Sequence, residues 1–536
     1  MSSWPLPEGI VGKPVGIKVS IAALGPGKYR CPVADALKAR QGLRPMSRRP
    51  CKPELLEQFT LRPFMSVMDL IEHKGKSPPE ALSTVGAGGE GTRNRQVHEG
   101  LLRWTAHSVA EYLRVFPQGS PGTDGERMLP VEQGWFYRQE LTKPDHRGVH
   151  RYEISAWGRC YQSADGRTRE LRMLTHRSDS RERTDAEISV AALVVAEGGP
   201  GPRPEHVRIV QFACMDGVVR PLFDGTHSAA VTRYAEQGKL ALSVAVDGQE
   251  YRPGAPCASC AYSITCPALP RAPGLLGISD QTRPRRTWSV TNGRAYGACP
   301  ARDHLRRHHL PTDRAIEHGR APERGRAIHA HLRRRHASRP LARCAPDIGD
   351  TWTTDGYDLA EEDVDLSRRL LRHHAEVCPL QHLPPDAEIR VEPLLAFDDT
   401  DADVLVLAAP DLLYRDGDSW VWREVKTSGS DLRWSSDLLT DFPQLALAVM
   451  VLSRTDLGGG RARSRVELEV LRPAGVDLEI IDPFASAVRT HAAAVLRDLI
   501  RDWHADDHFR PRPGAECVRC EVARWCPSRS TTEMTR

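Results

Sequence analysis

Lysine is scarce in this chain of 536 residues, since 64 of its 74 basic residues are arginine. Beyond Lys239 the sequence contains one further lysine, Lys426. An ammonium is a compact point charge whose pKa shifts readily on burial, whereas a guanidinium is a planar fork that stays charged. We therefore expect Lys426 to fill a role that arginine cannot. The formal net charge is only +4, so any nucleic-acid contact must come from local patches rather than from overall charge.

Long apolar runs are also missing. The two longest, 188–196 and 445–452, are less than half as long as a membrane-spanning helix requires. The first ten residues lack the charged and apolar regions of a secretion signal. We therefore expect a cytoplasmic protein without membrane contact. The length predicts two to four domains, and a composition of 40% hydrophobic and 27% charged residues argues against a disordered chain.

Cysteine is present in a pattern that favours metal or cluster ligation over disulfides, because thirteen cysteines occur without a secretion signal. Two triplets share the spacing Cys-x2-Cys-x5-Cys, and the segments around them, 253–267 and 513–527, are identical at seven of fifteen positions. A Cys-Pro pair shortly after a tyrosine precedes each triplet by more than two hundred residues. The candidate tetrads are Cys31, Cys257, Cys260 and Cys266, and Cys299, Cys517, Cys520 and Cys526. Such tetrads hold an iron-sulfur cluster or zinc, and spacing alone does not decide between them.

The repeated landmarks predict two tandem modules, 1–270 and 288–536, joined by a Pro/Arg-rich linker at 271–287. A third matched pair is Arg95-x2-His98 and Arg326-x2-His329; chance similarity of short motifs is the alternative. The other cysteines are isolated in sequence and are interpreted as small buried hydrophobes. The histidine pairs are interpreted as surface or core residues rather than metal ligands. These residues are Cys51, Cys160, Cys214, Cys344 and Cys378, and the pairs His308-His309 and His373-His374.

Hydropathy patterning in the second module indicates an α/β fold. Helices are expected at 324–336, 438–452 and 483–504, and strands at 388–397, 404–413, 420–427 and 465–471. A turn at 415–418 joins the second and third of these strands into a hairpin. The first of the hairpin strands is expected to end with Asp411.

The hairpin carries the most legible chemistry. Residues two apart on a strand point to the same face, so Glu424 and Lys426 should project together beside Asp411. Two carboxylates at one place repel each other unless a cation joins them, and Mg²⁺ or Mn²⁺ suits such oxygen ligands. A divalent ion beside an ammonium is suited to phosphodiester hydrolysis. The alternative is an ordinary exposed hairpin, because Asp, Glu and Lys are common around an Asp-Gly turn.

Together, these motifs resemble the RecB-like branch of the PD-(D/E)XK nucleases, especially its iron-sulfur members, which include the AddB nuclease domain and the CRISPR-associated spacer-processing exonucleases. The resemblance covers most of residues 288–530. Its elements occur in the family's order: Cys299-Pro300, Gly325-x3-His329, Val391-Glu392, Pro410-Asp411, Glu424-Val-Lys426-Thr427, Gln444 in Pro-Gln-Leu, and the closing cysteine triplet. The aromatic residue that usually follows the glutamine by four positions is Ala448 here, which departs from the motif.

The resemblance implies two restriction-endonuclease-like modules and Mg²⁺- or Mn²⁺-dependent cleavage of DNA. It implies metal ligation by His329, Glu392, Asp411 and Glu424, with Lys426 assisting the attacking water and Gln444 completing the site. It favours [4Fe-4S] clusters in the tetrads over zinc. A setting in repair, recombination or antiphage defence, beside a separate helicase or ATPase, is likewise implied.

The first module is expected to be a catalytically silent copy. An ungapped comparison that places Glu170 at the position of Glu424 puts Trp157 where Asp411 stands. The same comparison puts Arg172 at the position of Lys426, and a one-residue slip would put Gly158 rather than Trp157 at the position of Asp411. A site with one carboxylate and a guanidinium has lost the pair that joins a metal. A different fold for this half is the alternative.

Positive charge concentrates in residues 301–336, which contain ten Arg and seven His against four acidic residues. Phosphate neutralisation supplies most non-specific affinity for nucleic acid, so this segment is a candidate DNA contact. The candidate residues are Arg306, Arg307, Arg324, Arg326, Arg333 and Arg334. The alternative is a solvated helical face that pairs with the acidic stretch 347–365. A non-catalytic nucleic-acid-binding scaffold and an RNA-processing nuclease are the competing functions.

Overall fold

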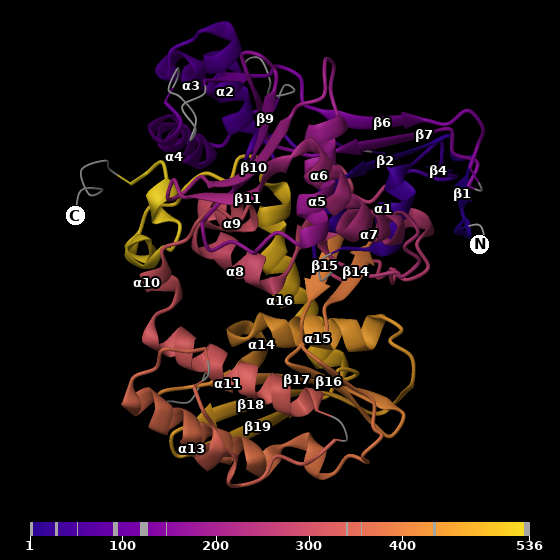
Figure 1. Cartoon of the computed structure of the whole chain (residues 1–536). Coiled ribbons are helices and arrows are strands. Elements are labelled where there is room, and N and C mark those ends of the chain that lie inside the picture. The colour runs from indigo at the N-terminus through magenta and orange to yellow at the C-terminus, as the bar shows by residue number, and fades with distance from the viewer. Residues whose placement is uncertain are drawn as a thin grey trace.

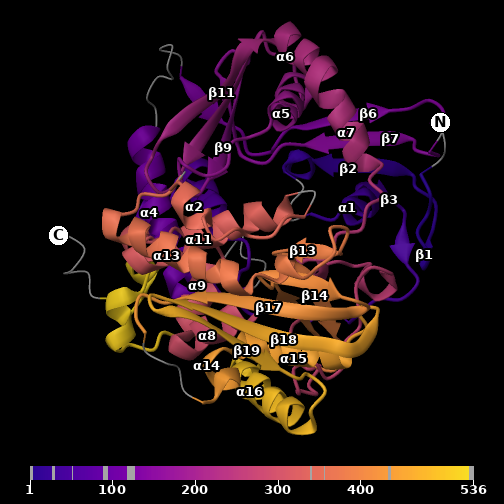
Figure 2. The same cartoon turned by 90° about the horizontal axis from the view of Figure 1, so that it is seen from below.

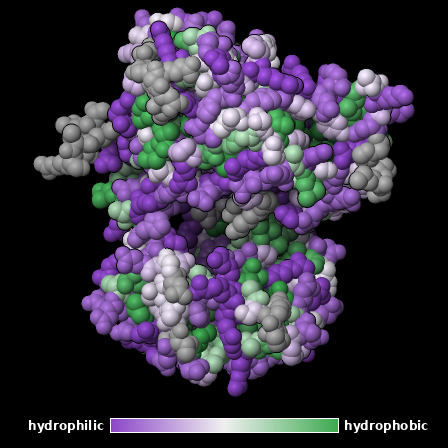
Figure 3. Space-filling model, in the orientation of Figure 1, coloured by the Kyte–Doolittle hydropathy of each residue, from purple (hydrophilic) through white to green (hydrophobic). Residues whose placement is uncertain are grey.

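The computed structural model describes residues 4–26, 30–50, 52–88, 95–117, 127–145, 147–338, 341–354, 356–431 and 436–529. Across these ranges, no helix is both long enough and apolar enough to cross a membrane. The chain is a mixed α/β protein with an upper and a lower lobe (Figure 1). The space-filling view shows a hollow between the two lobes, bordered largely by hydrophilic residues (Figure 3).

The lower lobe is built on a five-stranded sheet with the order β13-β16-β17-β18-β19. Strands β17 and β18 are parallel, and the other neighbours are antiparallel. A three-stranded sheet has the order β12-β15-β14, with β12 parallel to β15. The strands are β12 (Arg286–Trp288), β13 (Ile389–Val391), β14 (Leu395–Asp399), β15 (Val404–Ala408), β16 (Leu412–Asp416), β17 (Ser419–Thr427), β18 (Gly460–Arg472) and β19 (Gly475–Ile481).

Helices cover both faces of the five-stranded sheet (Figure 2). Helices α11 and α13 lie on one face, and α15 and α16 lie on the other. The apolar run 445–452 is a fully buried stretch of α15 rather than a membrane segment. The helices are α8 (Val290–Ala298), α9 (Pro300–Arg307), α10 (Arg314–Glu317), α11 (Arg320–Ala337), α12 (Ile348–Thr351), α13 (Glu361–Val377), α14 (Leu438–Asp441), α15 (Pro443–Arg454) and α16 (Ser486–Ala505).

The N-terminal half contains a five-stranded and a four-stranded sheet, with orders β11-β10-β9-β8-β5 and β3-β2-β7-β6. Its strands are β1 (Ile10–Val11), β2 (Gly16–Ser20), β3 (Arg40–Gln41), β4 (Arg44–Pro45), β5 (Met128–Pro130), β6 (Phe136–Glu140), β7 (Arg151–Ser155), β8 (Arg159–Ser163), β9 (Thr168–Thr175), β10 (His206–Ala213) and β11 (Val219–Thr226). Its helices are α1 (Pro32–Ala39), α2 (Arg62–Lys74), α3 (Pro78–Gly86), α4 (Glu99–Val115), α5 (Asp185–Glu197), α6 (His227–Arg233) and α7 (Lys239–Val246).

Both halves repeat one strand plan. Strands β5-β8-β9-β10-β11 pair in the same sequence of senses as β13-β16-β17-β18-β19, with the parallel pair in the same place. Likewise, β2-β7-β6 and β12-β15-β14 each consist of a parallel pair followed by an antiparallel pair. In each half a buried helix, α5 or α15, joins the two parallel strands. A shared topology of this length supports the duplication that the cysteine repeat predicts.

The two halves share a hydrophobic core. Trp104 on α4 contacts Trp525 near the C-terminus, with ring centroids 5.0 Å apart. Leu305 on α9 lies in the same cluster. The segment predicted as a linker, 271–287, is also packed, because Leu275 and Leu276 are fully buried in the core of the second half. Each half thus has a hydrophobic cluster of its own, and a further cluster joins the two halves.

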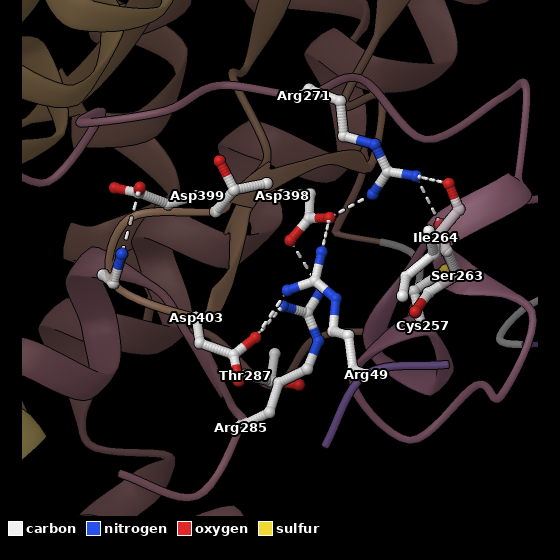
Figure 4. A network of polar contacts seen from close by, with 12 residues as sticks. Arg49, Cys257, Ser263, Ile264, Arg271, Arg285, Thr287, Asp398, Asp399 and Asp403 are labelled. Atoms are coloured by element: carbon white, nitrogen blue, oxygen red, sulfur yellow. Dashed lines mark hydrogen bonds and ion pairs between the residues drawn. The ribbon is translucent and has the colours of Figure 1, made fainter. Parts of the chain in front are cut away.

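A polar network fastens the same junction (Figure 4). Asp398 on β14 is fully buried and pairs with Arg49, Arg271 and Arg285. Arg49 and Arg285 also pair with Asp403. Arg271 donates further hydrogen bonds to the carbonyls of residues 263 and 264, beside the first cysteine triplet. One carboxylate thus joins the N-terminal segment, the predicted linker and the second half.

The predicted elements of the second module are largely confirmed. Two of the predicted strands are each broken in two: 388–397 into β13 and β14, and 404–413 into β15 and β16. Asp411 therefore lies in the break before β16 instead of ending a strand. The predicted strand 465–471 is the buried part of the longer β18. β19 was not predicted, although Val476, Leu478 and Ile480 alternate with Asp477 and Glu479 along it.

Candidate active site

Asp411 occupies the three-residue break where the chain passes from the three-stranded sheet to the five-stranded sheet. Its Oδ2 accepts a hydrogen bond of 2.7 Å from the backbone N–H of Val425. Because β16 pairs with β17 from Leu412 opposite Arg423 onward, Asp411 lies beside Glu424. The break therefore turns a carboxylate onto the edge of the hairpin, at the place that the sequence predicts.

Glu424 and Lys426 project together from β17, as their spacing predicts. The Nζ of Lys426 donates to Glu424 Oε2 and to the Val425 carbonyl, each at 3.1 Å, and lies 3.6 Å from Asp411 Oδ2. The indole Nε1 of Trp422 donates to the second oxygen of Glu424 at 3.0 Å. Glu424 is only 5% exposed. The lysine thus joins two carboxylates at the edge of a buried sheet face.

His329 and Glu392 reach the surroundings of Asp411 from other elements. The Nδ1 of His329, on α11, lies 3.2 Å from Asp411 Oδ1. Glu392 follows β13, its backbone N–H donates to the Asp411 carbonyl, and its carboxylate pairs with Arg333 at 3.2 Å. Glu392 has a φ of 45°, a left-handed conformation that costs a non-glycine residue about 1–2 kcal/mol. Such strain is concentrated at functional sites.

The charges of this group depend on one another. Burial would raise the pKa of Asp411, but His329 and Lys426 hold that pKa below its ordinary value. Burial would lower the pKa values of His329 and Lys426, but the neighbouring carboxylates raise both. Burial raises the pKa of Glu424, against the lowering effect of Lys426 and with a further contribution from Asp411. The site therefore favours positive charge between its carboxylates.

The donor set fits a divalent cation. Asp411, Glu424 and Glu392 offer carboxylate oxygens, and His329 adds an imidazole nitrogen, a combination that suits Mg²⁺ or Mn²⁺. The position of the Lys426 ammonium between two carboxylates shows that these side chains are spaced to share a cation. A narrow cavity is lined by His329, Glu392 and Asp411 together.

The other predicted site residues lie at varied distances from this cluster. Gln444 is half-buried in the first turn of α15, and within the described ranges it makes no hydrogen bond to these carboxylates. Arg333 and Arg334 are exposed on α11, and Arg333 pairs with Glu392. The other predicted arginines contact acidic groups or aromatic rings of the chain: Arg306 with Glu521, Arg307 with Asp303, Trp503 and Phe509, Arg324 with Asp363, and Arg326 with Glu323.

The ungapped comparison that placed Glu170 at the position of Glu424 is wrong, because the strand pairing of the first half has a different register. The break between β7 and β8 has three residues, like that between β15 and β16, and its last residue is Gly158, which is the alternative to Trp157 that a one-residue slip gives. The β8–β9 register places Met173, not Glu170, diagonally beside it, as Glu424 lies beside Asp411. Thr175 then corresponds to Lys426. A Cβ on Gly158 would lie 2.5 Å from the Arg172 carbonyl oxygen, so this backbone admits no aspartate there.

Glu170 and Arg172 instead point to the opposite face. Arg172 donates to Glu170 and to the Tyr112 hydroxyl of α4, and its guanidinium lies 3.8 Å from the Tyr161 and Phe116 ring centroids. Met173 lies in the apolar cluster beneath α5. The first half therefore offers no ionisable side chain at the three equivalent positions. His98, matched to His329 in the sequence, hydrogen-bonds the Phe509 carbonyl at the junction of the halves.

Each predicted cysteine tetrad lines a single cavity. The two sites repeat the same backbone contacts: Gly254 and Gly514 donate their N–H groups to Cys257 and Cys517, both at 3.4 Å. The N–H groups of Arg252 and Arg512 likewise donate to the upstream cysteines, Cys31 at 3.5 Å and Cys299 at 3.3 Å. N–H donors directed at sulfur stabilise thiolate character, which is what a metal or cluster ligand requires.

One group was missed in the sequence. Cys344 and Cys378 are buried, as predicted, but they are not isolated, because they meet His336 and His374. Within the described ranges, this is the one group of three or more His, Cys, Asp or Glu residues whose ligand atoms all lie within 4.8 Å of one another. His374 is fully buried, as a core residue would be, and its Nε2 faces His336 in this group. The signal available was the spacing His374-x3-Cys378, which puts both residues on one face at the end of a helix. Cys51 lies outside the described residues.

Residues 287–527 match the family described as the PD-(D/E)XK nuclease superfamily, and they form a domain of that fold which contains the whole candidate site. Among curated proteins no match was found. A solved structure titled "Crystal structure of SSO0001" is 16% identical and covers 48% of this chain and 91% of its own, with a TM-score of 0.24. A TM-score this low does not show a shared fold.

Proposed function

We propose that the protein is a metal-dependent deoxyribonuclease of the RecB-like PD-(D/E)XK type. The observation that supports it best is the convergence of Asp411, Glu424 and Lys426 with His329 inside the domain that matches this superfamily. An exposed hairpin would not bury Glu424 or hold its ammonium partner between two carboxylates. The second half is the active copy in this proposal, and the first half is silent.

The side chains divide the work of hydrolysis. Asp411, Glu424, Glu392 and His329 would hold a divalent ion, which supplies charge neutralisation at the phosphoryl oxygen and a more acidic water. Lys426 would orient the attacking water and stabilise the charge that develops in the transition state. The Val425 N–H and the Trp422 indole fix the orientation of the two carboxylates before substrate arrives.

The cysteine tetrads are proposed to hold [4Fe-4S] clusters, with zinc as the alternative. Support comes from the paired N–H···S contacts and from the cavities that each tetrad lines. The resemblance to iron-sulfur nucleases favours clusters, which would be structural because each joins the two ends of a module. A role in repair, recombination or antiphage defence, with a separate helicase supplying unwound DNA, follows from the same resemblance.

Nucleic acid would contact the chain through basic surface on both halves. Arg333 on α11 lines the same cavity as His329 and Asp411, and Arg334 is exposed next to it in sequence. A cavity of about 1070 Å³ at the junction of the halves is lined by Arg48, Lys52 and Arg95 from the first half and by a further group of arginines from the second. Cationic side chains that line a groove are suited to a phosphate backbone.

Cleavage of labelled single-stranded DNA, double-stranded DNA and single-stranded RNA, with Mg²⁺ or Mn²⁺, tests the proposal. Wild type should cut DNA, and Lys426→Ala should reduce the rate by about 10²–10³-fold while DNA binding persists. Lys239→Ala, at an exposed position on α7, is the matched control and should cut normally. Cleavage of RNA alone would identify an RNA-processing enzyme, and binding without metal-dependent cleavage would identify a scaffold.

A further inference from the structure

We propose that His336, Cys344, His374 and Cys378 form a structural zinc site, separate from the nuclease centre and from both cysteine tetrads. The four residues come from the last turn of α11, the segment that follows it, the last turn of α13 and the residue after that helix. All four are buried, with exposures of 3% or less. This inference does not depend on the proposed nuclease function.

The spacing of the donor atoms is that of a tetrahedral ion. A zinc ion with Zn–N distances of about 2.0–2.1 Å and Zn–S distances of about 2.3 Å separates its ligand atoms by about 3.3 Å for N···N and about 3.6 Å for N···S. The Nε2 atoms of His336 and His374 lie 3.3 Å apart. The Sγ atoms of Cys344 and Cys378 lie 3.6 and 3.8 Å from His336 Nε2.

The buried surroundings of the group suit a metal ion. Two imidazole nitrogens and two sulfurs face one another in a cluster otherwise lined by apolar residues such as Ile348, Trp352 and Leu371. The four side chains contact one another at 3.3–3.8 Å through the nitrogen and sulfur atoms that zinc prefers as ligands. Two thiolates and two neutral imidazoles around Zn²⁺ give no net charge, which suits this interior. An S₂N₂ donor set in tetrahedral geometry favours zinc over the harder Mg²⁺ or Ca²⁺.

The surroundings orient one of the ligands as metal sites require. The Nδ1 of His374 hydrogen-bonds Glu469 Oε1 at 2.6 Å, which leaves Nε2 directed at the cluster. Glu469, on β18, is fully buried and also accepts from Arg423 on β17 at 3.1 Å. A carboxylate behind a ligating histidine fixes its ring and raises its basicity. The residues behind the site thus complete a carboxylate–histidine–metal arrangement.

The site would join α11 and α13 to the sheet that carries the catalytic cluster. His336 follows His329 by seven residues, so the two histidines lie on nearly the same face of α11, two turns apart. Arg423, which pairs with Glu469, immediately precedes Glu424. An ion at His336 would therefore fix the helix that presents His329 to Asp411, although it lies too far along the helix to act in the reaction.

Metal content of the purified full chain tests this site. Zinc and iron per chain are measured in wild type, in the double variant Cys344→Ser/Cys378→Ser and in the control Cys214→Ser, which changes a buried cysteine outside the cluster. The double variant should hold one zinc fewer than wild type with unchanged iron, and the control should lose none. His336→Cys, which keeps a ligand, should retain the zinc that His336→Phe loses.

A milder variant covers the case in which the double variant does not fold. Glu469→Gln keeps all four ligands and should release one zinc at about 10–100-fold lower chelator concentration than wild type. Equal zinc content in wild type and the double variant would overturn the site. A chelator curve for Glu469→Gln identical to that of wild type would also overturn it, as would a Cys344–Cys378 disulfide found by peptide mass.

Discussion

Loss of the Asp398 carboxylate should loosen the junction between the two halves. Asp398 is fully buried and faces three guanidinium groups. Among the residues drawn in Figure 4, Asp403 is the other carboxylate that pairs with arginines of this group. The variant Asp398→Asn keeps the volume of the side chain but removes its charge. After this substitution, one carboxylate instead of two remains to compensate the three arginines. Removing one partner of a buried ion pair costs about 3–5 kcal/mol, because the remaining charges stay buried without compensation.

This cost translates into a modest thermal shift. Unfolding entropy of about 2.1 cal/mol/K per residue gives about 1.1 kcal/mol/K for the whole chain if it unfolds as one unit, so the melting midpoint should fall by about 3–4 °C. Differential scanning calorimetry measures it. Asp401→Asn, in the neighbouring turn and without a recorded ion pair among the described residues, should stay within about 0.5 °C of wild type.

Arginine variants sharpen the same test. In the Asp398→Asn background, Arg271→Ala removes a charge that has lost its partner and should recover part of the lost stability, whereas in wild type it should destabilise. A melting midpoint for Asp398→Asn within 1 °C of wild type would refute the reasoning that this carboxylate holds the junction. Equal destabilisation by Arg271→Ala in both backgrounds would refute the coupling.

Two further predictions concern acid stability and the cysteine tetrads. Glu187 in the first turn of α5 is buried, and although burial raises the pKa of its carboxyl, Arg181 and the Thr184 N–H lower that pKa below its ordinary value. The stabilising effect of the Glu187 carboxylate should therefore be complete above about pH 4.3 and lost as the pH falls through the lower folded-state pKa. At pH 7, Glu187→Gln should have a free energy of unfolding about 1–3 kcal/mol lower than that of wild type. This difference in stability should shrink at pH 3. Cys520→Ser should remove about four irons per chain and leave the first tetrad filled, with Cys160→Ser as the control; unchanged iron would count against ligation by the second tetrad.

The convergence of Asp411, Glu424 and Lys426 was predictable because its geometry is local. Strand periodicity puts Glu424 and Lys426 on one face, and an antiparallel hairpin brings Asp411 beside them. The equivalent positions in the first half could not be found without the strand register. The β8–β9 turn has four residues, whereas the β16–β17 turn has two, so an ungapped comparison shifts the second strand.

The packed junction and the Cys/His group depend on tertiary structure. Leu275 and Leu276 sit in a segment rich in Pro and Arg, and only the second half's core shows why they are buried. His336, Cys344, His374 and Cys378 form no compact sequence motif, since they span 43 residues and meet only when α11 packs beside α13. The cysteine triplets, by contrast, are short motifs that place their own ligands together.

The most direct test of the nuclease centre is the single-turnover rate of DNA cleavage in Mn²⁺, compared between wild type and Asp411→Asn. Asp411 contacts both His329 and Lys426, and asparagine keeps its shape without its charge. We expect metal-dependent cleavage by wild type that EDTA abolishes, and a rate at least about 10²-fold lower for Asp411→Asn at equal DNA binding. Equal rates in the two proteins would contradict the assignment of this cluster as the active site.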